Sequence, residues 1–235
     1  MRGVASIALS ATAITWSNVV LPAFGLSPRA RAVVNTAAGL SAIGVLLARG
    51  YTREELGLAH TGIRGGAQFG GAAAGAVLTG YSVALAVPSL RATLAADERA
   101  DGREDFLEWI MLHVPFGTVL SEELLFRSAM SAVWSRELNR PTAQAVHALT
   151  FGLWHVAPAR GAGDNVPAAV AFTGASALLF EWLHRRGGSV LAPALLHLAT
   201  NAGGALAYRG GSWRAPSRRD CALRSPPART ARAAP

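Results

Sequence analysis

Six polar side chains lie in three apolar runs of this chain, and their types suit hydrolysis by an activated water molecule. They are Glu122, Glu123, Arg127, His155, His197 and Asn201. The first three share one run, and the others fall in two later runs. Ionisable groups at membrane depth are costly and rare, and they usually mark a functional site. A carboxylate, an imidazole and an amide on separate helices can activate a water and stabilise an oxyanion.

The two adjacent glutamates are expected to differ in their surroundings. Glu123 precedes Arg127 by four residues, a spacing and order that favour an ion pair on one helix face. Glu122 is turned by about 100° from Glu123 on a helix of 3.6 residues per turn, and no local cation faces it. An unpaired carboxylate in an apolar site can act as a general base or acid. The alternative is that both glutamates are packing or topology charges.

Two later helices add imidazole and amide groups. A lone histidine such as His155 in an apolar helix is more often a satisfied core residue than a catalyst. His197 and Asn201 are four residues apart and therefore stack on one face. Such a pair can hold a metal, orient a water or donate to a developing oxyanion. Complementary groups on three helices are therefore predicted to converge on one wet pocket inside the bilayer.

The remaining polar residues of the apolar runs are given lesser roles. His147 lies two turns before the motif histidine of its helix and is expected at most to support the site. Glu181 is expected to snorkel or to pair with Arg185, four residues on. His113 and His184 lie near the ends of apolar runs, where solvation at the membrane interface would suffice.

Seven apolar stretches must position these groups. Only 15% of the residues are charged and 51% are apolar, whereas a soluble domain carries about 25% charged residues. The stretches are roughly 4–24, 32–48, 66–88, 106–137, 142–158, 166–184 and 189–208. A crossing of the ~30 Å hydrocarbon core needs about 20 residues. The sequence predicts an all-α, polytopic integral-membrane bundle of about seven spans, with the active site between spans four, five and seven.

Three stretches carry further expectations. The first could be a secretory signal peptide, but its apolar run is long for one, and a retained span is favoured. Gly66, Gly70, Gly71 and Gly75 give the third stretch small-xxx-small spacing, which favours close packing within the bundle over dimerisation. In the fourth, Pro115 should break or kink the helix. The span is therefore expected to begin near Phe116, with 106–113 at the interface.

The chain is expected to divide into a membrane-embedded domain, 1–208, and a basic, disordered tail, 209–235. The net charge is +8, and seven arginines follow Tyr208. Without interleaved aromatic residues, such a tail suggests contact with anionic lipid or a positive-inside signal, not nucleic-acid binding. The single cysteine, Cys221, excludes an intramolecular disulfide framework. A composition rich in Ala and Arg without Lys suggests a GC-rich, bacterial genome and hence a multi-pass protein of the bacterial plasma membrane.

The three polar motifs, taken in order, resemble those of the CAAX protease and bacteriocin-processing family of intramembrane endopeptidases. The matching segments are Glu122-Glu123-Leu-Leu-Phe-Arg127, Phe151-Gly-Leu-Trp-His155 and His197-Leu-Ala-Thr-Asn201. The likeness covers a motif core of roughly 105–205. Ser128 follows Arg127 where members often carry glycine, a minor departure.

The resemblance implies roles for the matched residues. Glu122 and His155 would activate the attacking water, and His197 and Asn201 would stabilise the tetrahedral oxyanion. Glu123 and Arg127 would form a supporting pair that fixes Glu122. The family is usually described as metalloproteases, and Glu122, His155 and His197 could bind Zn²⁺. A metal-free, glutamate-activated water is equally consistent with these residues.

The leading hypothesis is a membrane-embedded endopeptidase acting on a membrane protein or peptide, with membrane lipid as its other partner. One alternative is a non-catalytic immunity or regulatory protein of the same fold, which loss of a motif residue would have favoured. A second is a proton-coupled transporter, since buried Glu and His also serve proton relays. Transporters of that kind carry internal repeats, and this sequence has no such symmetry.

Overall fold

The computed structural model describes residues 3–94 and 103–212, and helices are the only regular secondary structure in this part of the chain. The predicted all-α class is confirmed. The longer helices are α1 (Val4–Thr15), α3 (Pro28–Ala48), α4 (Ile63–Ala86), α8 (Arg140–Trp154), α10 (Val166–Gly187) and α11 (Leu191–Ser212). The short helical segments are η1 (Trp16–Val20), α2 (Leu21–Ala23), η2 (His60–Gly62), α5 (Pro88–Leu94) and α9 (Val156–Ala162).

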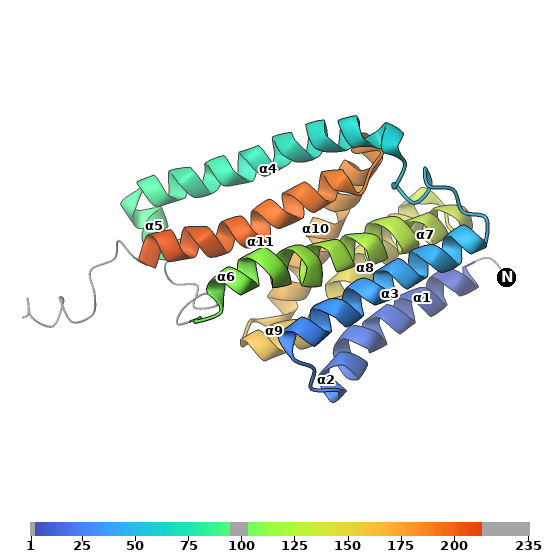
Figure 1. Ribbon diagram of the computed structural model, residues 1–235, viewed down its shortest axis with the longest axis horizontal. Coiled ribbons are helices and arrows are strands. Elements are labelled where there is room, and N and C mark those ends of the chain that lie inside the picture. Colours follow the sequence, from blue (N-terminus) through green and yellow to red (C-terminus); the bar gives the residue numbers. More distant parts are fainter. Residues whose placement is uncertain (1–2, 95–102, 213–235) are drawn as a thin grey trace, which may run out of the picture.

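One further helix is continuous from Phe106 to Glu137 and is called the central helix here. Its segments are α6 (Phe106–Glu108), η4 (Trp109–Leu120), η5 (Glu123–Met130) and α7 (Ser131–Glu137), where η4 and η5 have π-helical hydrogen bonding. Contacts with α3 and with α11 hold it between these two helices, and Figure 1 shows it in green in this position.

The helix starts follow from local sequence. Ser27, Asn139 and Asn165 precede α3, α8 and α10, and each side-chain oxygen accepts a hydrogen bond from the backbone N–H three residues on. A proline occupies the first or second helical position in all three, where the missing N–H costs nothing. Gly188, with φ 64°, ends α10 in the left-handed region, so α11 can turn back beside α4.

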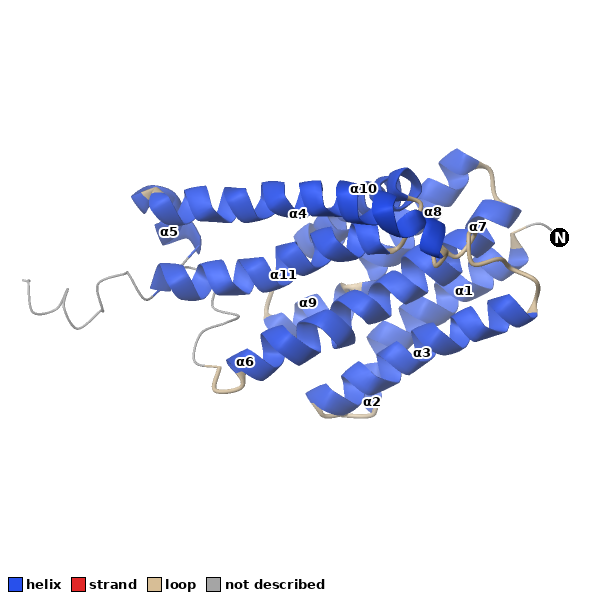
Figure 2. Ribbon diagram, turned by 45° about the horizontal axis from the view of Figure 1, so that its top comes forward, coloured by secondary structure: helices blue, strands red, loops and turns tan. Residues whose placement is uncertain are grey.

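Glycines allow α4 to approach the start of α11 closely. A Cβ added at Gly70 would lie 2.6 Å from the backbone oxygen of Ala192, and one at Gly66 would lie 3.0 Å from Ser189 Cβ. These two positions confirm the prediction of packing within the bundle. A Cβ at Gly71 or Gly75 would meet nothing within 4 Å. Figures 1 and 2 show α4 and α11 side by side along their length.

Within residues 3–94 and 103–212, four helices are long and apolar enough to cross a membrane. They are Val4–Ala23, Pro28–Ala48, His60–Ala86 and Val166–Gly187. The other predicted spans are helical too, but α8 has only 15 residues, which is short for a ~30 Å hydrocarbon core. The central helix and α11 contain the polar motif side chains among their apolar residues. Length and composition therefore support four of the seven expected spans.

The sequence predicts a break or a kink at Pro115, and the break is wrong. The helix runs through Pro115, which lies inside η4, so no boundary falls at Phe116. In an α-helix the proline ring clashes with the carbonyl of the preceding turn. The wider π-helical turn, with i→i+5 hydrogen bonds, moves that carbonyl away from the ring and leaves the helix unbroken.

The expected domain boundary also shifts. Helix α11 continues through Arg209 to Ser212, so the tail cannot begin at 209. Residues 213–235, which hold Cys221 and the other tail arginines, lie outside the described residues.

Candidate active site

Glu122 lies at the centre of the candidate site. Its side chain is buried, and Trp154 Nε1–H donates to Oε1 at 3.1 Å. The other oxygen, Oε2, makes no hydrogen bond with the described residues. It lies 3.9 Å from His155 Nε2 and 4.0 Å from His197 Nε2. The structure thus brings together a carboxylate and two imidazoles that come from the central helix, α8 and α11.

Glu123 orients His197. Glu123 Oε1 lies 2.8 Å from His197 Nδ1, which turns the opposite ring nitrogen towards Glu122. Arg127 Nη1 lies 3.3 Å from the same oxygen, so the expected Glu123–Arg127 ion pair is present. The contact between Glu123 and His197 goes beyond the predicted supporting role, because Glu123 fixes a histidine directly.

Aromatic rings enclose Arg127. Its side chain is fully buried, and its guanidinium lies over the rings of Phe151 at 4.2 Å and Phe180 at 4.8 Å. Phe180 also stacks on His197 at 5.0 Å between centroids. An arginine in this position gains cation–π attraction and keeps the Glu123 charge compensated without water. The same Phe180 ring therefore packs against both Arg127 and His197.

His155 lies where α8 ends and α9 begins, with φ −90° and ψ 4°. Its Nδ1 lies 2.8 Å from the carbonyl oxygen of Phe151. A carbonyl can only accept, so this nitrogen carries the proton in the neutral ring and Nε2 is left as an acceptor. The ring also packs edge-on against Phe151, with centroids 4.8 Å apart. Both contacts direct Nε2 towards Glu122.

The N-terminal helix braces this junction. Ser17 Oγ–H donates to the carbonyl of Trp154 at 2.6 Å. The Asn18 amide donates to the carbonyl of Leu153 at 2.8 Å and accepts from the N–H of Ala157 at 2.7 Å. These contacts satisfy backbone groups where α8 stops. Sequence reasoning missed Trp154, Ser17 and Asn18 as contributors to the site.

Asn201 is the least engaged of the predicted residues. It lies one turn beyond His197 on α11 and is partly exposed. Within residues 3–94 and 103–212, no hydrogen bond or ion pair joins it to the other five residues. Its helix position brings it near His197 without a direct contact.

The three candidate metal ligands approach one another through Glu122. Its Oε2 lies 3.9 Å from His155 Nε2 and 4.0 Å from His197 Nε2. Zinc holds His and carboxylate ligands at about 2.0–2.2 Å, which requires three donors to converge on one point. No cluster of three or more His, Cys, Asp or Glu side chains that could hold a metal ion occurs among the described residues.

Glu181 forms a second buried polar cluster. It accepts hydrogen bonds from Ser131 at 3.0 Å and from Arg185 at 2.6 Å, and His147 Nδ1 lies 3.4 Å away. The expected pairing with Arg185 is confirmed, and snorkelling is wrong because the carboxylate is buried. His147 stacks on Phe126 beside Arg127, with centroids 6.4 Å apart, so this cluster adjoins the candidate site.

The expectation that His113 and His184 are solvated at the membrane interface is wrong. His113 and His184 are both buried. His113 Nε2 lies 3.0 Å from Glu108 Oε1, and His184 Nδ1 lies 3.8 Å from Glu181 Oε2. A carboxylate takes the place of water at His113 Nε2, whereas His184 Nδ1 makes no hydrogen bond with the described residues.

A comparison with protein families identifies the segment that holds this site. Residues 105–203 match the family described as type II CAAX prenyl endopeptidase Rce1-like. The match spans all six candidate residues and confirms the resemblance found in the motifs. No curated protein and no solved structure matches the chain. Together with the four apolar helices, the family indicates an integral membrane protein of the protease class.

Proposed function

We propose that this chain, whose residues 105–203 carry the Rce1-like segment, is an intramembrane endopeptidase that hydrolyses a peptide bond of a membrane-associated protein or peptide. The bundle would cross the membrane about seven times, with the reaction between the central helix, α8 and α11. One observation carries the proposal. A buried carboxylate oxygen without a hydrogen bond lies between two imidazole nitrogens, at 3.9 and 4.0 Å.

These separations suit a reacting water. Both exceed a direct hydrogen bond, and a single water can bridge polar atoms at such distances. Glu122 Oε2 would remove a proton from that water, and His155 Nε2, the acceptor nitrogen of its ring, would accept the other hydrogen bond. The Trp154 N–H would hold Glu122 Oε1 in place during the transfer.

The same residues would then serve the steps in which bonds to the substrate form and break. The water oxygen attacks the carbonyl carbon of the substrate, and the carbonyl oxygen becomes an oxyanion. In the imidazolium form of His197, Nδ1–H donates to Glu123 and Nε2–H remains to donate to that oxyanion, joined by the Asn201 amide. As the C–N bond breaks, Glu122 returns its proton to the leaving amine. Carboxylate and water are therefore sufficient for a metal-free reaction.

Proteolysis by the full chain, purified in detergent, tests the proposal against a library of membrane peptides. Glu122→Gln and His155→Ala should each lower the cleavage rate by about 10²–10⁴-fold. Glu54→Gln changes an exposed loop glutamate whose side chain makes no hydrogen bond or ion pair with the described residues, so it serves as the matched control. Thermal melting shows whether each variant folds. Equal cleavage by wild type, Glu122→Gln and His155→Ala would end the endopeptidase proposal.

Elemental analysis and chelation separate the metal-free mechanism from a zinc mechanism. The purified, active chain should hold substoichiometric zinc and keep its activity in chelator. Stoichiometric zinc, together with a loss of activity in chelator that added zinc restores, would overturn the metal-free mechanism. The endopeptidase activity itself would stand in that case.

A further inference from the structure

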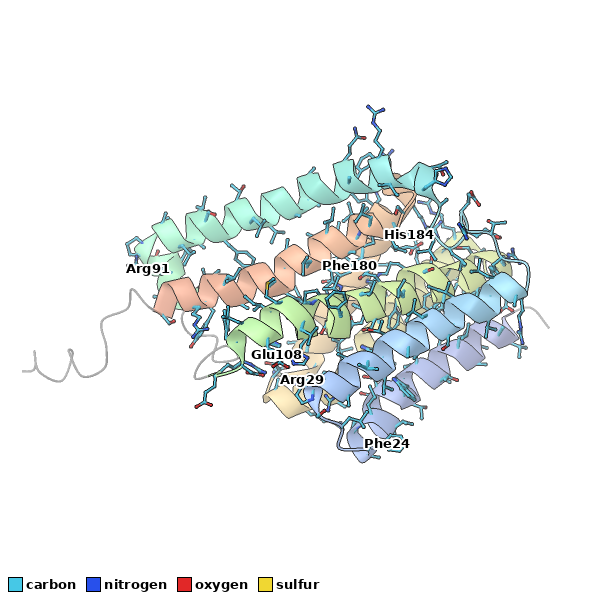
Figure 3. The ribbon with its side chains drawn as sticks, viewed as in Figure 1. Phe24, Arg29, Arg91, Glu108, Phe180 and His184 are labelled. Carbon is cyan, nitrogen blue, oxygen red and sulfur yellow. The ribbon has the colours of Figure 1, made fainter. Side chains whose placement is uncertain are left out.

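A hollow away from the candidate active site lies where the start of α3 faces the start of η4. It encloses about 230 Å³, and its lining includes Arg31, Arg103, Trp109, His113 and Thr118. Figure 3 labels Arg29 of α3 and Glu108 of α6, which lie close together at this end of the bundle. The hollow therefore opens beside the interfacial end of the central helix.

The two arginines Arg31 and Arg103 are the charged residues among those that line the hollow in the described part of the chain. Arg29 binds Glu108 through two hydrogen bonds of 2.6 and 2.7 Å, and these bonds lower the pKa of the Glu108 carboxyl to about 2. Arg103 binds Asp105 through two bonds of 3.0 and 2.8 Å. Arg31 is exposed, and its guanidinium makes no ion pair or hydrogen bond with the described residues. The guanidinium of Arg31 is thus left to bind an anion.

His113 supplies a second group without a partner. The residue is only 8% exposed, and its Nε2 lies 3.0 Å from Glu108. Its Nδ1 is buried and makes no hydrogen bond with the described residues, although the ring lines the hollow. Leaving such an atom unpaired is costly, and a polar ligand that reached it through the hollow would remove this cost.

The surroundings of the hollow suit the depth of lipid headgroups. Arg103 lies over the Trp109 ring at 4.7 Å, and Arg209 lies over the Phe106 ring at 4.2 Å. Arginine with aromatic rings at helix ends is typical of the membrane–water interface. Further along the same helix, Met111 is 70% exposed, and such an apolar surface suits acyl chains.

We propose that this hollow binds the headgroup of an anionic phospholipid. Arg31 and Arg103 face the phosphate, and His113 Nδ1 binds a headgroup oxygen or hydroxyl. The positive end of the 21-residue helix α3 adds to the attraction. Basic pockets between membrane helices bind such headgroups. The proposal requires no peptide hydrolysis and stands apart from the proposed function.

Lipid titration of the full chain in detergent tests the site. Short-chain phosphatidylglycerol is compared with short-chain phosphatidylcholine, and the melting temperature reports binding. Phosphatidylglycerol should raise the melting temperature at lower concentration than phosphatidylcholine. Arg31→Gln should weaken binding of phosphatidylglycerol about fivefold, the usual effect of one arginine near an anionic surface. His113→Phe, which fills the ring position but removes both nitrogens, should also weaken it.

Arg91→Gln is the matched control. Arg91 lies on α5, and Figure 3 shows it well separated from Arg29 and Glu108. This variant removes the same charge without touching the hollow, and it keeps the basic tail. Equal weakening of phosphatidylglycerol binding by Arg31→Gln and Arg91→Gln would attribute the weakening to general surface charge. That result would contradict the proposed site. So would equal binding of the two lipids. Tight binding of free glycerol phosphate would indicate a soluble ligand and overturn the lipid assignment.

Discussion

His197 Nδ1 lies 2.8 Å from Glu123 Oε1, and the opposite ring nitrogen faces Glu122 at 4.0 Å. Two adjacent glutamates of one helix thus face the two ring nitrogens of a single histidine. The buried Arg127 compensates the glutamate on the Nδ1 side. The carboxylate on the Nε2 side keeps an oxygen without a hydrogen bond. Adjacent positions of identical type therefore have different chemical roles.

The first prediction concerns Glu123. Glu123→Gln keeps the shape of the side chain but removes the charge that faces both Arg127 and His197. We expect a loss of about 10–100-fold in cleavage rate, typical of residues that orient a reacting histidine. The loss should fall on kcat and leave KM little changed, because Glu123 faces His197. A lower melting temperature with wild-type kcat would assign Glu123 a purely structural role.

The second prediction concerns the packing of α4. Gly70→Ala would place a Cβ 2.6 Å from the backbone oxygen of Ala192, and overpacking of this kind costs about 1–3 kcal/mol. Gly75→Ala meets open space and should be neutral or stabilise by up to about 1 kcal/mol, because alanine is the better helix former. Thermal melting of the two variants compares the sites directly. Similar melting temperatures would contradict the observed approach of α4 to α11.

The third prediction concerns a surface pair that ties the loop after α3 to α7. Arg136 binds Glu55 through two hydrogen bonds of 2.7 Å. These bonds, with the N–H of Thr52, lower the pKa of the Glu55 carboxyl from its ordinary 4.5 to about 2. A lowered pKa in the folded state contributes stability above the unfolded value, and this stability is lost as pH falls through the folded value.

Melting of wild type and Glu55→Gln across pH measures this contribution. Wild type should be the more stable protein above pH 4.5, and the difference should disappear as the pH falls to about 2. The expected effect is small, because the pair is exposed. A difference that persists unchanged at low pH would show that the glutamine affects packing and not the ion pair.

Local signals in the sequence were sufficient to predict the helices. Each of the seven apolar stretches is helical for most of its length. The break expected at Pro115 is absent because the rule that proline breaks helices applies to α-helical geometry. The residue pattern did not indicate the π-helical turn that accommodates the proline.

The candidate site was predictable in part. Four-residue spacing correctly placed Glu123 beside Arg127, and the motif order pointed to Glu122, His155 and His197. Trp154 was missed because a tryptophan in an apolar run is normally a core residue, and its bond to Glu122 joins positions 32 residues apart. Ser17 reaches Trp154 over 137 residues. Contacts of this range depend on the tertiary fold and leave no trace in local spacing.

The uninterrupted central helix has a mechanical consequence. It carries His113 at the lipid-facing hollow, Glu122 at the candidate site and Arg136 at the loop pair, so one rigid rod joins both faces of the bundle. Sliding or tilting of that rod would change the distances from Glu122 to both imidazoles at once. Membrane helices accommodate a change in bilayer thickness by tilting, so such a change would act on the geometry of the candidate site.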